Sequence, residues 1–83
     1  MSALNDLLLA LRAVEDQLRL ARGQLTQGRK ALAEAHAALA RLDPNNPETV
    51  VPPGLQRADD QIERTLTVID HVDDTLRGFA TRL

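Results

Sequence analysis

The sequence has no cysteine, tryptophan or tyrosine, and Phe79 is its single aromatic residue. Without cysteine there is no disulfide framework, no thiolate metal site and no cysteine nucleophile. The longest apolar run, residues 7–11, is far shorter than the ~20 residues of a membrane-spanning helix. Because no basic region precedes that run, we expect no cleavable signal peptide. We therefore expect the chain to be cytoplasmic, or exported together with a partner.

Neither sign of charge predominates, because the chain has 10 basic and 12 acidic residues and a net charge of −2. This balance argues against a dedicated nucleic-acid binder or a protein of anionic membrane surfaces. The 83 residues are enough for one small domain, which we expect to cover residues 1–83.

Proline is absent except in one segment, residues 43–54, which contains all four prolines and ends at Gly54. A helix does not run through such a segment, because proline lacks a backbone donor and clashes with the preceding turn. The rest is rich in Ala, Leu, Arg, Glu and Gln, which favour helices. We predict helices over about residues 3–42 and 55–82, with Ser2 capping the first and either Thr49 or Gly54 capping the second.

Apolar residues repeat every seven positions in both predicted helices, which is the pattern of a coiled coil. With Leu4 as heptad position a, both the a and the d positions are apolar or small in nearly every heptad. The sequence therefore predicts an all-α fold, an antiparallel two-helix hairpin that resembles a coiled coil. Its expected core consists of Leu18, Leu25, Gly28, Leu32, Leu39, Ile62, Ile69, Val72, Leu76 and Phe79.

The register that we expect places Leu42 opposite Leu55, and hence Gly28 opposite Ile69. Large side chains then face small ones in most layers, which favours dense packing. In this register Arg22 lies near Asp73, and His36 lies near Asp59.

The first predicted helix is longer than the second by about 17 Å at ~1.5 Å per residue. Its uncovered start carries the expected interaction residues Leu4, Leu7, Leu8 and Leu11, because exposed apolar patches usually mark interaction sites. Our first expectation is a homodimer in which two hairpins form a four-helix bundle. The alternative is a larger protein partner that offers helices to the same segment. We do not expect a membrane contact, since Arg12 is the only nearby basic residue.

We expect no catalytic, cofactor-binding or metal-binding residues. Residues 23–30 imitate a phosphate-binding loop, but Arg29 separates Gly28 from Lys30 and no strand precedes them. The histidines, His36 and His71, have no acidic residue three positions before them, so they lack a bundle metal motif. An alternative function is RNA binding by a small dimeric hairpin, through the basic stripe formed by Arg12, Arg19, Arg22 and Arg29.

The start of the chain, Met-Ser-Ala-Leu-Asn-Asp-Leu-Leu, the Ala/Leu/Arg-rich first helix and the segment from Gln61-Ile-Glu-Arg to Leu76 resemble small helical-hairpin proteins of actinobacteria. These include WXG-type partners of type VII secretion and related short chains encoded near polymorphic toxins. The resemblance covers the whole chain and implies an adaptor for helices of a larger protein. The segment between the helices departs from that family, since it has no Trp-x-Gly, and no Tyr is available for the family's export signal.

Overall fold

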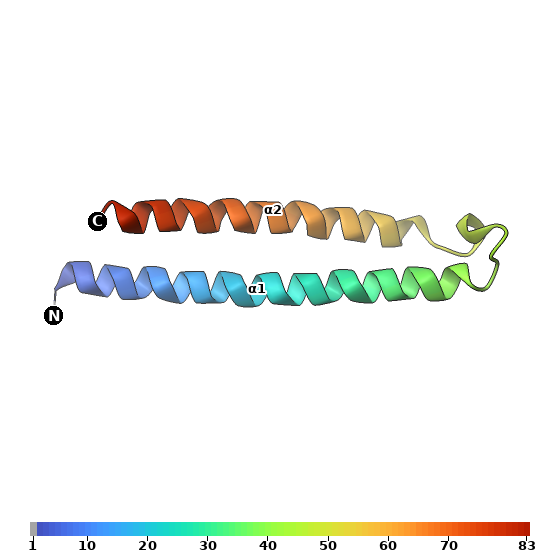
Figure 1. The fold of residues 1–83 in the computed structure, drawn as a ribbon, viewed down its shortest axis with the longest axis horizontal. Helices are drawn as coiled ribbons and strands as arrows, with labels where there is room; N and C mark the ends of the chain where they lie inside the picture. Colours follow the sequence, from blue (N-terminus) through green and yellow to red (C-terminus); the bar gives the residue numbers. More distant parts are fainter. Residues whose placement is uncertain (1) are drawn as a thin grey trace.

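The computed structural model describes residues 2–83, which form a hairpin of two long antiparallel helices (Figure 1). Helix α1 spans Ala3–Ala40, a short 3-10 helix η1 spans Pro47–Thr49, and helix α2 spans Pro53–Thr81. The described part of the chain contains no strand, which confirms the all-α class and is compatible with the predicted hairpin. No helix in residues 2–83 is long and apolar enough to cross a membrane.

The helix ends follow from capping and from proline. The Ser2 hydroxyl accepts a hydrogen bond from the backbone N–H of Asn5 at 3.0 Å, which confirms the predicted N-cap of α1. Helix α2 begins two residues earlier than predicted because Pro53 occupies its first turn, where a missing N–H costs nothing. Pro52 therefore takes the N-cap position, and neither Thr49 nor Gly54 caps this helix. The Thr49 hydroxyl instead donates to the carbonyl of Asn46 at 2.8 Å.

No residue in the range 2–83 is buried, because each helix has only one neighbour to pack against. The half-buried positions nevertheless recur at intervals of three and four, as the heptads require. Half-buried seam residues of α1 include Leu11, Leu18, Ala21, Leu25, Gly28, Leu32, Ala35 and Leu39, and those of α2 include Leu55, Ala58, Ile62, Thr65, Ile69 and Leu76.

Two expected core residues, Val72 and Phe79, are exposed in the single hairpin at 38% and 44%. Their neighbours Asp73 and Ala80 are half-buried in their place. An α-helix drifts by ~20° per heptad relative to a strict seven-residue repeat. In the last turns of α2, at the open end of the hairpin where both chain ends lie, this drift turns position d outward and position e inward.

The expected register is wrong by one heptad. A Cβ atom on Gly28 would lie 3.8 Å from Cδ1 of Ile62, whereas Ile69 was the expected partner. Asp59 forms its ion pair with Arg29, seven residues before the expected neighbour His36, which agrees with the same shift.

The connector explains the shift. Val50 and Val51 are half-buried beside η1, and η1 packs on α1. The connector therefore lies against α1, and Leu55 lines a groove with Leu32 instead of lying opposite Leu42. As a result α2 reaches further toward the start of α1, and the uncovered segment is shorter than expected.

The register predicts which cysteine pair joins the helices. Because the chain has no native cysteine, the double variant Gly28→Cys/Ile62→Cys should form an intramolecular disulfide under mild oxidation, measured as a mobility shift on non-reducing gels. The matched variant Gly28→Cys/Ile69→Cys should not. Preferential cross-linking of the second pair would show that the helices take the other register.

Gly23 is a point of low helix stability. It lies inside α1, and a Cβ atom built there would meet nothing within 4 Å. Gly23→Ala should therefore raise the free energy of unfolding by about 1 kcal/mol, the difference in helix propensity between the two residues. Thermal unfolding followed by circular dichroism measures this, and an unchanged or lower midpoint would contradict it.

Candidate interaction surface

The hairpin has two long faces, one on either side of the plane that contains both helices. Both helices are right-handed and run in opposite directions, so positions e of the two helices lie beside each other, as do positions g. The face with positions a, b and e is called here the paired-charge face. The opposite face, with positions d and g, is called the uncharged face.

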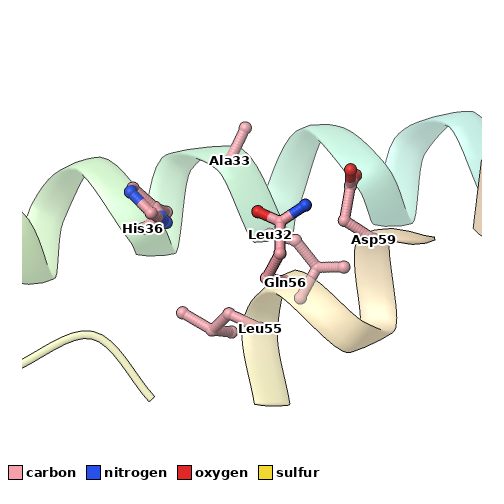
Figure 2. Close-up of a pocket in the computed structure, with 6 residues that line it drawn as sticks. All are labelled: Leu32, Ala33, His36, Leu55, Gln56 and Asp59. Atoms are coloured by element: carbon pink, nitrogen blue, oxygen red, sulfur yellow. The ribbon is translucent and has the colours of Figure 1, made fainter. Parts of the chain in front are cut away.

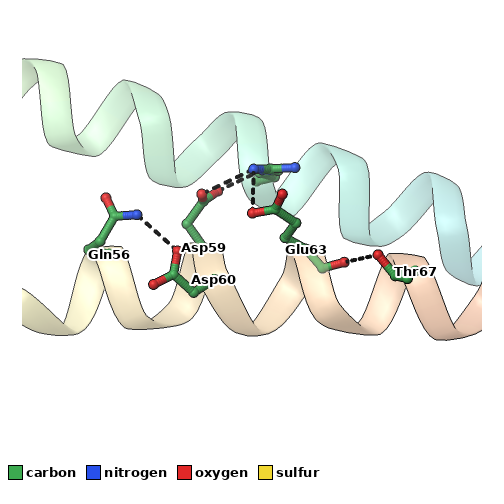
Figure 3. A network of polar contacts seen from close by, with 6 residues as sticks. Gln56, Asp59, Asp60, Glu63 and Thr67 are labelled. Carbon is green, nitrogen blue, oxygen red and sulfur yellow. Dashed lines mark hydrogen bonds and ion pairs between the residues drawn. The ribbon is translucent and has the colours of Figure 1, made fainter.

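Ion pairs between the helices lie on the paired-charge face. The Arg29 guanidinium donates from Nε to Asp59 Oδ1 at 2.8 Å and from Nη2 to Asp59 Oδ2 at 3.3 Å. The same Nη2 lies 3.5 Å from Oε2 of Glu63. A turn or two along, Arg22 Nη2 lies 3.4 Å from Asp70 Oδ2. Figure 3 shows Asp59 and Glu63 directed from α2 toward the helix opposite.

The fork formed by Arg29 and Asp59 is the best-defined polar contact between the helices. The hydrogen bond to Asp59 and the negative charge of Asp59 raise the pKa of Arg29 above its usual value, while partial desolvation opposes them. A raised pKa in the folded state means that this contribution to stability is complete below the usual Arg pKa and is lost only above it. Arg29 therefore keeps its charge at neutral pH.

Two shallow grooves follow the same face between the helices. One is lined by Leu32, Ala33 and His36 of α1 and by Leu55, Gln56 and Asp59 of α2, as Figure 2 shows. His36 and Asp59 were expected to be neighbours, and both line this groove. The second groove is lined by Glu15, Leu18, Arg19, Arg22, Ile69, Asp70, Asp73 and Arg77. Every lining residue of both grooves occupies position a, b or e, which agrees with the assignment of the faces.

The uncharged face carries no Lys, Arg, Asp or Glu within Ala3–Ala40 or Pro53–Thr81. Its large apolar side chains are exposed, with Val14 at 45% and Val68 at 60%. The g positions are Ala3, Ala10, Gln17, Gln24, Ala31 and Ala38 in α1 and Gly54, Gln61, Val68 and Thr75 in α2. The sequence analysis missed this face because it compared the charges of whole helices. A comparison of positions e and g would have found it.

The expected interaction residues are not all equivalent in the structure. Leu4, Leu7 and Leu8 are exposed at 48%, 39% and 38%, whereas Leu11 is half-buried against α2. Leu7 lies at position d and so continues the uncharged face to the start of α1. Leu4 and Leu8 lie at positions a and e, on the side of the paired-charge face, so of these three leucines only Leu7 belongs to the uncharged face.

The other candidate sites have little support in the structure. Residues 23–30, which imitate a phosphate-binding loop, lie inside α1, where their backbone N–H groups take part in the helix. Three of the four arginines of the proposed RNA-binding stripe are paired with carboxylates: Arg19 with Asp16, Arg22 with Asp70, and Arg29 with Asp59 and Glu63. Within residues 2–83 no cluster of three His, Cys, Asp or Glu side chains is arranged to hold a metal ion.

The Arg29–Asp59 pair should show measurable coupling between the helices. In a double-mutant cycle of Arg29→Gln and Asp59→Asn, we expect the two substitutions together to destabilise less than the sum of each alone. The coupling should shrink in high salt, because both groups are solvent-accessible. Urea unfolding measures it, and a matched cycle on Arg19 and Asp16, neighbours within α1, serves as a control for pairs that do not join the helices. Equal coupling in the two cycles would contradict a special role for Arg29.

No protein-family model, no curated protein and no solved structure matches the chain. The resemblance to WXG-type partners therefore stays a prediction, and the functional argument depends on the surface of the hairpin itself.

Proposed function

We propose that this chain is a non-catalytic helical interaction module that completes its core by assembling with other helices. In the assembly that we favour, two copies form a four-helix bundle. The alternative partner is a pair of helices of a larger protein, in the manner of a secretion- or toxin-associated adaptor. We place the module in the cytoplasm, or outside the cell after export with that partner.

One observation carries this proposal: none of the residues 2–83 is buried in the single hairpin. Full burial of a Leu, Val or Phe side chain is worth ~1.5–3 kcal/mol, and small domains have little other stabilisation. A second layer of helices would bury the apolar surface that the first layer leaves in contact with water. An apolar stripe that is wider than positions a and d is typical of helices in such a bundle.

The first test is the solution mass, measured by light scattering on a sizing column over a range of protein concentrations. We expect the mass of a dimer, about twice the 9.1 kDa of the chain. The double variant Leu7→Asp/Leu8→Asp should shift the protein toward the monomer, because both leucines are exposed in the hairpin and available to a partner.

Leu9→Asp is the matched control, since Leu9 is an exposed leucine of α1 at position f, which points away from the seam. This variant, like His71→Ala, should leave the mass unchanged. Assembly that persists in the Leu7/Leu8 variant, or is lost equally in the Leu9 variant, would contradict the proposal. A monomeric wild-type chain would exclude the homodimer and favour the larger partner.

A further inference from the structure

We propose that the uncharged face is the surface on which a second copy of this chain docks, through its own uncharged face and with the two copies oriented end for end. This inference rests on the proposed function and adds to it the face, the occupant and the orientation.

The distribution of charge selects the face. In a hairpin that acts alone, positions e and g are equivalent borders of the seam, and both usually carry charged residues. Here the e positions include Glu15, Arg22, Arg29, Asp59 and Asp73, whereas every g position of α1 and α2 is uncharged. Removing a charged group from water is costly, so a face without charges is the one suited to becoming an interface.

The same absence of charge selects a second copy as the occupant. Inside the strip of positions d and g, a helical partner of opposite charge would find no ionised group to pair with, because the nearest charged residues, such as Glu34 and Arg64, lie along its outer edge. An identical face meets it without leaving any charge unpaired. A two-fold dimer, in which the same patch is used twice, is also the most common oligomer of soluble proteins.

The size of the side chains selects the orientation. The open half of the face, near both chain ends, carries large exposed residues such as Leu7, Val14, Val72 and Phe79. The half near the connector carries small ones: Gly28, Ala31, Ala35, Ala38 and Ala58. If the second copy is reversed end for end, the large half of each copy lies on the small half of the other. Large-on-small packing fills space at native density, whereas two open ends together would crowd large residues at one end and leave gaps at the other.

The available area is sufficient for a stable dimer. The hairpin measures 65 × 16 × 14 Å, so one long face covers about 1,000 Å², compared with ~800 Å² per partner in an interface of standard size. The end-for-end arrangement places its two-fold axis near the middle of α1, close to Gln24.

The test of the face uses two double variants that add the same charge with almost no change in shape. Gln24→Glu/Gln61→Glu places four carboxylates in the proposed interface of the dimer. Asn5→Asp/Gln56→Glu places the same number at position b, on the paired-charge face and away from the proposed interface. All four side chains are exposed in the single hairpin, so neither variant disturbs the seam. By sedimentation equilibrium, the first variant should raise the dimer dissociation constant at least tenfold and the second should not, with equal helix content in both.

The outcomes separate this inference from the proposed function. A wild-type dimer that is weakened by neither variant, or equally by both, would overturn the uncharged face as the interface and leave the interaction module intact. A wild-type chain that stays monomeric would overturn both the homodimer and this inference.

The orientation has its own measurement, which the absence of cysteine makes simple. A spin label on Ala10→Cys, at position g near the open end, should give a label-to-label distance of roughly 40 Å in the dimer at ~1.5 Å per helical residue. A label on Gln24→Cys, near the axis, should give a much shorter distance. A short distance at position 10 would show that the open ends lie together and would overturn the end-for-end arrangement.

Discussion

A helix that touches only one neighbour can cover only one stripe of its surface. This constraint governs the whole molecule, because the 29-residue α2 packs along α1 and, apart from the short η1 beside α1, no further helix covers either of them in the described chain. The seam repeats faithfully, yet even its central leucines remain half-exposed. In physical terms the hairpin is one layer of a core, since folded domains are built from at least two packed layers.

The two sides of that layer have different roles. Ion pairs and hydrogen bonds join the helices along the paired-charge face, where Arg29 bridges Asp59 and Glu63. Solvent-exposed pairs contribute little to stability, but they disfavour wrong alignments of the helices. The uncharged face has no ion pairs between the helices and offers apolar, small and uncharged polar side chains. One side therefore aligns the hairpin, and the other is free to associate.

Much of the fold could be predicted from the sequence, and the exceptions have a common cause. Proline placement and helix propensity gave both helices to within two residues, and Ser2 was identified as the cap of α1. The heptads predicted the half-buried seam up to Ile69, but not the exposure of Val72 and Phe79, because strict seven-residue spacing ignores the drift of a 3.6-residue helix. The pairing of Gly28 could not be predicted, since a heptad repeat is nearly unchanged by a shift of seven residues. The connector, where η1 packs on α1 and Val50 and Val51 are half-buried, favours one of the two alignments, and periodicity does not describe it.

The connector between the helices thereby acts as a mechanical stop. Two alignments one heptad apart would offer similar seams, and the half-buried valines beside η1 prevent the helices from sliding from one to the other. The pairing of every seam layer along the hairpin is thus fixed at the connector end. An insertion or deletion in the connector would move all the layers at once, so the length of this loop and the order of residues in both helices are constrained to change together.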